Sequence, residues 1–378
     1  MSGSSEPTGN ASWNVWGRRW PEWVPFAAGG WGVLYAAVQV TWVMAEVDVR
    51  WAPHVSYPPA FHLLLAALAV LVALVCVATT RDFGRRVRGV LLVSLGATIP
   101  VSVLGMASLP AHVVTLASSA GVESATGLAQ VLVNAVGTVL LVLVAIAYRR
   151  RLRGRCPRCG QKHPGAGDGP LAHPRAGIAS KRTRRTVYIL MCGLLPWAGV
   201  KTIWTLGGDA LGVTAEGWRE INAGGPGAVE ALAAVGIDVT VLAAAAGVFL
   251  LLGLMYPWGQ VFPRWTLVLA GRRVPRLLPL LPAWLAAVSL SVYGIFLMIF
   301  APLTALGVLP NPAIAPPFTT TSGITWMIEF GGLAFGGLGL GLVAAARSYA
   351  TRTRPVCAAH LPVHRPADAS QFGSVTAK

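Results

Sequence analysis

One stretch decides the fold: Phe61-His-Leu-Leu-Leu-Ala-Ala-Leu-Ala-Val-Leu-Val-Ala-Leu-Val-Cys-Val-Ala78, followed at once by Thr79-Thr-Arg-Asp-Phe-Gly-Arg-Arg-Val-Arg88. About 20 apolar residues make a transmembrane helix, because the hydrocarbon core of a bilayer is about 30 Å thick. Arginines directly after such a run hold that end on the cytoplasmic side. The two signals together predict a membrane span whose C-terminal end lies inside.

The same pairing of signals recurs along the whole chain. Of its 378 residues only 12% are charged, and the mean hydropathy is +0.62; soluble domains carry about 25% charged residues. The sequence therefore predicts an all-α, polytopic helical membrane protein with about eight transmembrane helices. The eight apolar segments are 24–45, 60–80, 89–110, 127–148, 186–206, 229–254, 278–305 and 324–347. The basic tract 260–276, with two prolines, is too short to span and is expected at the interface.

The placement of basic residues predicts the orientation. With the N-terminus inside, 27 of the 30 Lys and Arg residues fall in inner segments; Arg50 and Arg219 lie outside, and Lys201 lies within a span. The positive-inside rule then puts both termini in the cytoplasm. The net charge of +16 reflects topology, so the expected partner is the lipid bilayer and no nucleic acid. The Arg- and Ala-rich composition indicates a high-GC bacterium, and hence the bacterial cytoplasmic membrane.

The eight spans divide into two similar fours. Two tails match at a constant offset of 201 residues, and both follow a fourth span. The matched residues are Tyr148, Cys156, Cys159 and His163 in the first tail, and Tyr349, Cys357, His360 and His364 in the second. Four spans per half give both halves the same orientation, which predicts two parallel repeats related by an axis along the membrane normal.

This organisation divides the chain into five parts. The two membrane repeats are separated by a basic linker rich in Cys and His, and each end carries a cytoplasmic tail. The predicted boundaries are 1–23 for the N-terminal tail, 24–148 for the first repeat, 149–185 for the linker, 186–347 for the second repeat and 348–378 for the C-terminal tail.

The matched tails also predict a metal site. Cys-x2-Cys is the spacing at which two thiolates bind one tetrahedral zinc ion, and His supplies further ligands. One ion shared across the pseudo-two-fold axis, or a site completed within the linker by His163 or His173, would both satisfy this pattern. Redox sensing, or a basic loop without a ligand, are the alternatives. The candidate ligands are Cys156, Cys159, Cys357, His360, His163 and His364, and the expected cofactor is a structural zinc.

Ionisable residues within spans form a second candidate site. Lys201, Asp238 and Glu329, with Gln39 at the position that matches Lys201, are costly at membrane depth and normally face the bundle interior or water. They predict a polar cavity in which Lys201 pairs with an acidic group. A buried pair that only fixes helix register, or side chains that reach the interface, would explain them as well. Asp238 is expected near the middle of the sixth span.

A glycine-rich run in the last span reads Gly331-Gly-Leu-Ala-Phe-Gly-Gly-Leu-Gly-Leu-Gly341. Small residues three and four positions apart allow two helices to approach closely within a membrane. No strand precedes the run, which excludes a nucleotide-binding loop. It therefore predicts a tight helix–helix contact.

Several loops resemble those of multi-pass membrane proteins of high-GC actinobacteria. The resemblance rests on Tyr256-Pro-Trp-Gly-Gln-Val-Phe-Pro-Arg-Trp265, on Arg272-Arg-Val-Pro-Arg276 and on Cys156-Pro-Arg-Cys159-Gly. It covers most of the chain, but its motifs are loose. It implies a membrane fold and no particular activity.

Three functions remain open from the sequence. The first is a transporter or permease-like component for a small solute or ion, based on the repeat and on the intramembrane charges. The second is a non-catalytic scaffold or regulator with a zinc-clamped cytoplasmic face. The third is a membrane enzyme acting on lipid or prenyl substrates. No convergent acid and base groups stand out, so no catalytic residues are assigned and a non-enzyme is favoured.

Overall fold

The computed structural model describes residues 20–52, 55–109, 112, 124–156, 159–162, 171–223 and 238–357. Within these residues, seven helical segments are long and apolar enough to cross a membrane. They confirm the predicted all-α, polytopic membrane fold. The segments are α2 (Trp20–Met44), α3 (Pro59–Ala78), α4 (Arg85–Leu104), α6 (Ala125–Leu152), α7 (Lys181–Met191) continued by α8 (Leu194–Thr205), α12 (Leu277–Ala305) and α13 (Thr321–Arg352).

The sixth predicted span is represented by a shorter helix, α11 (Val239–Met255). Its 17 residues extend over roughly 25 Å at about 1.5 Å per residue. Residues 224–237 lie outside the described part, so only the portion of this span from Asp238 onward is seen. Asp238 is the N-cap of α11 and accepts hydrogen bonds from the N–H groups of Thr240 and Val241. Its carboxylate thus satisfies the free donors of a helix start, and our expectation that Asp238 lies mid-span stays a prediction, because the preceding residues are outside the described part.

Short elements connect the helices. The tract 260–276 does not form a span, as predicted; 3-10 turns and an isolated bridge between Val261 and Arg273 fold it at the helix ends. Two antiparallel strand pairs complete the structure. These elements are α9 (Ala215–Ala223), η1 (Pro257–Gly259), η2 (Arg264–Leu269), β1 (Arg50–Ala52) with β2 (Val55–Ser56), and β3 (Leu171–Ala172) with β4 (Val356–Cys357).

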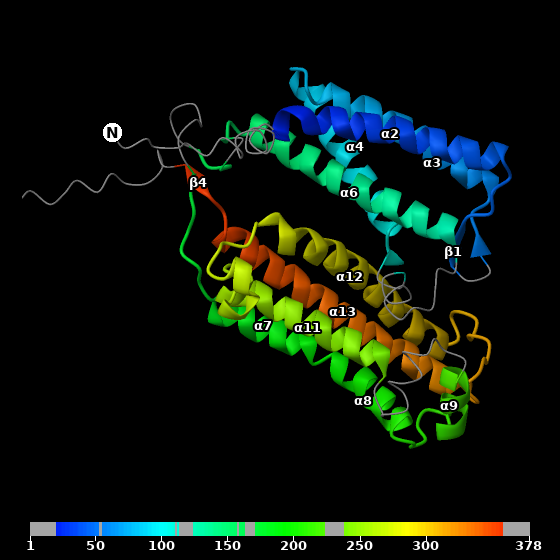
Figure 1. The fold of residues 1–378 in the computed structure, drawn as a ribbon. Helices are drawn as coiled ribbons and strands as arrows, with labels where there is room; N and C mark the ends of the chain where they lie inside the picture. The colour runs from blue at the N-terminus through cyan, green and yellow to red at the C-terminus, as the bar shows by residue number, and fades with distance from the viewer. Residues whose placement is uncertain are drawn as a thin grey trace, which may run out of the picture.

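The helices form two bundles that lie side by side (Figure 1). The first bundle contains α2, α3, α4 and α6, and the second contains α7, α8, α11, α12 and α13. They meet where Leu285 and Val288 of α12 pack with Met106 and Val131 of the first bundle. There Ser289 Oγ donates a hydrogen bond to the Met106 carbonyl at 3.3 Å.

Small residues determine how closely α12 and α13 pack. A Cβ at Gly294 of α12 would lie 2.1 Å from the backbone nitrogen of Gly336 in α13. Only glycine fits where two helix backbones are this close. The glycine-rich run of α13 therefore forms a tight helix contact, as its spacing predicted.

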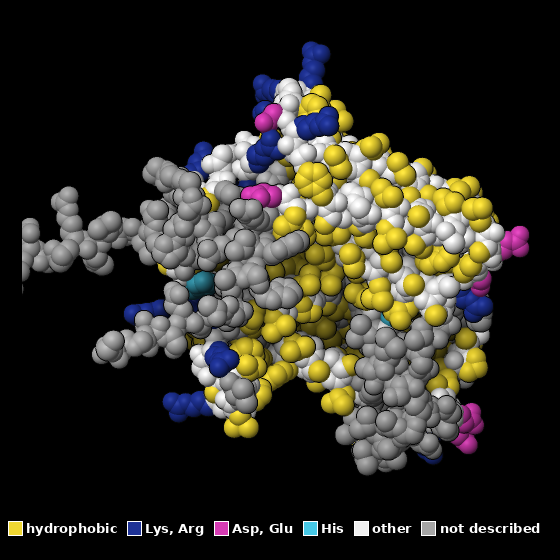
Figure 2. Space-filling view, turned by 45° about the horizontal axis from the view of Figure 1, so that its top comes forward, with side chains coloured by type: hydrophobic (Ala, Val, Ile, Leu, Met, Phe, Trp, Pro, Cys, Tyr) yellow, Lys and Arg dark blue, Asp and Glu magenta, His cyan; other side chains and the backbone are white. Residues whose placement is uncertain are grey.

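The surface has the pattern of a membrane protein. Large apolar side chains such as Leu64 (61% exposed), Leu74 (65%) and Leu250 (67%) point outward from the helices, where only lipid is a favourable neighbour. Figure 2 shows hydrophobic side chains over much of one face, with Lys and Arg gathered mainly at one end. We call this end the arginine-rich face; it carries 81–88, 149–155, 181–185 and 347–354.

Corresponding helices of the two bundles share one contact at their starts. A Cβ at Gly127, near the start of α6, would lie 2.5 Å from the carbonyl oxygen of Arg50. A Cβ at Gly323, near the start of α13, would come similarly close to the carbonyl oxygen of Leu211. Both carbonyls belong to the loop that follows the first span of their bundle. The same close approach is therefore present twice.

A second shared contact lies at the other end of the same helices. Arg151 of α6 donates hydrogen bonds to the carbonyls of Thr79 (3.1 Å) and Thr80 (2.9 Å), just after α3 ends. Arg352 of α13, at the matched sequence position, donates to the carbonyl of Leu254 at 2.6 Å, at the end of α11. Each arginine binds the free carbonyls of the second helix in its bundle. The second helices of the two bundles pack differently: α3 lies mainly against α2, the first helix of its bundle, whereas α11 lies mainly against α13, the last helix of its bundle. The duplication itself therefore stays a prediction.

Candidate functional site

The linker after the first bundle folds into a tight turn around its two cysteines. The Cys156 N–H donates to the Gln161 carbonyl at 2.9 Å, and the Gly160 N–H donates to the Cys156 carbonyl at 2.7 Å. Gly160 has φ +68°, a left-handed conformation that favours glycine. The Gln161 N–H then donates to Cys159 Sγ at 3.4 Å. A donor directed at sulfur stabilises a thiolate, which is the form that binds metals.

The third cysteine comes from the other end of the chain. Cys357 lies on β4, which pairs with β3 of the linker in the register Leu171 to Cys357. Arg354, just before β4, donates from Nε to the Cys159 carbonyl at 2.6 Å. The strand pair and this hydrogen bond fasten the segment after the second bundle to the turn after the first.

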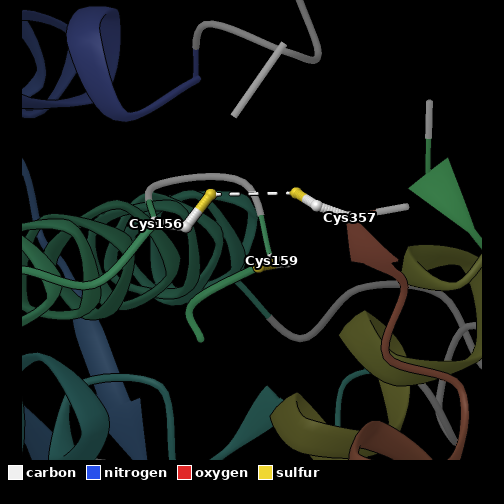
Figure 3. A group of neighbouring side chains, drawn as sticks. All are labelled: Cys156, Cys159 and Cys357. Carbon is white, nitrogen blue, oxygen red and sulfur yellow. Dashed lines mark hydrogen bonds between the residues drawn. The ribbon is translucent and has the colours of Figure 1, made fainter. Parts of the chain in front are cut away.

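The result is a group of three sulfur atoms (Figure 3). Cys156 Sγ and Cys357 Sγ lie 3.9 Å apart, and the three sulfurs of Cys156, Cys159 and Cys357 are all within 4.8 Å of one another. Zn–S bonds of about 2.3 Å in a tetrahedron separate two sulfurs by about 3.8 Å. The geometry therefore fits three ligands of a tetrahedral zinc ion.

The remaining predicted ligands have different outcomes. His163, His360 and His364 lie outside the described residues. His173 is described but does not belong to the sulfur group. Of the two arrangements left open by the sequence, the described cysteines fit the one in which both tails contribute to one ion.

Burial and positive charge surround the sulfurs. Cys159 and Cys357 are each only 1% exposed, and burial raises the pKa of the Cys357 thiol to about 12, with contacts to the other two thiols adding to the shift. Without an ion this thiol is neutral at pH 7; a bound metal displaces the proton. The guanidinium groups of Arg150 and Arg354 pack against Gly160. Their positive charge would offset the negative charge of a metal–thiolate group.

The intramembrane residues expected in one cavity lie in separate bundles. Gln39 is fully buried in the first bundle, where its Nε2 donates to Gln130 Oε1 at 2.7 Å and its Oε1 lies 2.5 Å from His62 Nδ1. Gln130 Nε2 in turn lies 2.7 Å from the Tyr35 hydroxyl, to which it donates. Gln130 and Tyr35 were missed from the sequence. Their signal was weak, because a single Gln or Tyr within a span is ordinary.

The second bundle holds the charged pair. Lys201 Nζ lies 3.3 Å from Asp238 Oδ2, and the two side chains are only 14% and 9% exposed. The ammonium also lies 4.4 Å from the ring centroid of Trp218 and 5.8 Å from that of Trp197, within the range of cation–π attraction. The predicted pairing of Lys201 with an acidic residue is thus present in the structure, at the start of α11.

Glu329 is the third ionisable residue of the second bundle that was expected in the cavity. Its Oε2 is buried in α13, and among the described residues it has no hydrogen-bond partner. Within that part of the chain, the ion pairs do not include it. Gln39 therefore lies in a different bundle from Lys201, Asp238 and Glu329, and the ion pair in the structure joins two of these four residues.

Comparison with known proteins finds no similar protein. The chain matches no protein-family profile, no curated protein and no solved structure.

Proposed function

We propose that this protein is a non-catalytic scaffold of the bacterial cytoplasmic membrane whose two helical bundles are clamped together by a structural zinc ion. One observation carries the proposal: sulfurs from two segments 201 residues apart, each following a different bundle, converge within bonding distance of a single ion. An ion there links the bundles covalently through its ligands, which neither the strand pair nor the contact at Met106 does.

The cytoplasmic position of the clamp is supported by charge and by redox chemistry. The clamp lies at the arginine-rich face, which the positive-inside rule places in the cytoplasm. Thiols stay reduced in that compartment, so three neighbouring cysteines there bind metal in preference to forming disulfides.

The number and type of ligands favour a structural ion. Three cysteines leave one position on a tetrahedral zinc, and His360 follows Cys357 by three residues. This spacing is short enough for His360 to complete the same site. Four protein ligands leave no open position for a substrate or water, so the ion supports assembly and not catalysis.

Metal analysis tests the clamp directly. We expect protein purified without chelator to contain one zinc ion per chain, and a Cys156→Ser/Cys357→Ser double variant to contain less than about a tenth of that, because two of four ligands are lost. Cys192→Ser is the matched control, since Cys192 is an exposed cysteine outside the sulfur group. Elemental analysis gives both numbers. Wild-type protein that stays free of zinc after expression in zinc-supplemented medium would contradict the proposal.

Transport of a small solute or ion is the second candidate, favoured by the buried pair of Lys201 and Asp238. A transport site must reach water. In proteoliposomes, an impermeant amine-reactive reagent should then modify Lys201 from either side, whereas Lys181 should react only from the arginine-rich side. Mass spectrometry of the peptides measures both. Lys201 left unmodified under conditions that fully modify Lys181 would exclude a water-accessible site at the pair.

A further inference from the structure

A cavity of about 490 Å³ opens at the arginine-rich face of the first bundle. It lies between the start of α2, the end of α3 and the end of α6, so it sits where three spans leave the hydrocarbon. That depth in a membrane is the level of the lipid headgroups. The cavity is separate from the sulfur group, although the turn that holds the sulfurs begins at its edge.

One side of the cavity is strongly basic. Arg150, Arg151 and Arg155 line it against a single carboxylate, Glu22. Arg151 is fixed by its hydrogen bonds to the end of α3 and by an ion pair with Asp82 at 2.7 Å. These contacts hold one guanidinium in place before any ligand arrives, which lowers the entropic cost of binding.

The other two arginines that line the cavity, Arg150 and Arg155, lie at the end of α6 and just after it. The Arg150 guanidinium carbon lies 5.7 Å from the ring centroid of Trp20 at the start of α2, within the range of cation–π attraction. Arg155 is exposed, and its side chain is free to turn toward a ligand. Guanidinium groups bind phosphate oxygens through strong, charge-assisted hydrogen bonds.

The opposite side of the cavity is apolar. Pro25 and Val144 are buried, whereas Phe26 is 59% exposed on the outer surface of α2. Pro21 and Ala147 complete this wall. The apolar lining therefore continues onto the lipid-facing surface. A free phosphate would leave this wall without a partner.

We propose that the cavity binds an anionic phospholipid, with its phosphodiester on the arginines and an acyl chain along Pro21, Ala147 and Phe26. Basic pockets between helices on the cytoplasmic side are a known physical basis for headgroup selection. The three guanidinium groups outnumber the two nearby carboxylates, Glu22 in the lining and Asp82 paired with Arg151, and this excess of positive charge favours a headgroup with net negative charge over a zwitterionic one. The lipid would bind without contacting the sulfur group, although Arg150 borders both the cavity and the turn at Gly160.

Native mass spectrometry of the detergent-solubilised protein tests the site. We expect one phosphatidylglycerol to bind at least about tenfold more tightly than phosphatidylcholine. Arg155→Gln should weaken phosphatidylglycerol binding by at least about tenfold, the value of one charge-assisted hydrogen bond. Ala147→Leu, which fills the cavity from α6, should do the same without any change of charge.

Arg153→Gln is the matched control, because Arg153 is exposed at the end of α6 and does not line the cavity. It removes the same charge, so it should weaken binding by no more than about fivefold, the general effect of one basic residue near an anionic surface. Equal losses for Arg155→Gln and Arg153→Gln, or no loss for Ala147→Leu, would overturn the proposal. So would equal binding of phosphatidylcholine. Inorganic phosphate that blocks phosphatidylglycerol binding at equal concentration would assign the cavity to the free anion instead.

Discussion

Gly294→Ala is expected to destabilise the second bundle by at least about 3 kcal/mol, at the upper end of the cost of overpacking. The new methyl group would lie 2.1 Å from the Gly336 backbone nitrogen and 2.5 Å from its Cα. A neighbouring side chain could rotate away from the new methyl group, but the backbone of α13 cannot. The two helices must separate, and their other contacts are lost with them. The midpoint of thermal unfolding in one fixed detergent measures the effect.

Gly96→Ala is the control for this prediction. Gly96 lies in α4, is exposed, and has no atom within 4 Å of the position that a Cβ would take. Alanine is a better helix former than glycine by about 1 kcal/mol, so this variant should be as stable as the wild type or slightly more stable. A Gly294→Ala protein with a wild-type unfolding midpoint would show that α12 and α13 do not pack as described.

Lys201→Met should cost about 3–5 kcal/mol of stability, the usual cost of removing one partner from a buried ion pair. Among the described residues, the Asp238 carboxylate would then remain buried with the N–H groups of Thr240 and Val241 and the Thr240 hydroxyl as its donors, but with no positive charge as a partner. A Lys201→Met/Asp238→Asn double variant should recover most of this loss, because it removes both charges and because Asn is also a good N-cap. The readout is again the midpoint of thermal unfolding.

The exposed pair of Arg50 and Asp48 provides the matched comparison. Their side chains are 51% and 54% exposed and lie 3.0 Å apart, so Arg50→Met should change stability by less than about 1 kcal/mol. If Lys201→Met is as mild as Arg50→Met, or if the double variant is no better than Lys201→Met alone, the burial of the Lys201 pair has no energetic consequence. Both ideas about its role, structural pairing and transport, would then lose their basis.

Most of the span pattern was readable from the sequence, for a simple physical reason. A helix in lipid satisfies its own backbone hydrogen bonds, so hydrophobic length alone specifies a span. Seven segments appear as predicted, and the glycine-rich run packs as its spacing indicated. The exception is the sixth span, in which Asp238 begins the described helix. Hydropathy does not detect that an aspartate is acting as a helix cap, because this depends on backbone geometry.

The sites were only partly predictable. The Cys-x2-Cys spacing and the matched Cys357 identified the sulfur group, since ligand spacing within a turn is a local property. Gln39 and Lys201 were placed in one cluster from sequence position alone, yet they belong to different bundles. The cavity of the first bundle was not foreseen at all, because its wall combines residues from three helices.

The sequence by itself determined that this protein crosses the membrane repeatedly and which of its ends are basic, because these properties depend on the length and charge of local segments. Only the tertiary structure decided that Cys156 and Cys357 meet, that Asp238 caps a helix beside Lys201, and that arginines of α6 face an apolar wall of α2. Each of these depends on how separate helices pack. In a membrane that packing is set by close backbone contacts and polar pairs, and not by hydrophobicity, which is the same on every lipid-facing surface.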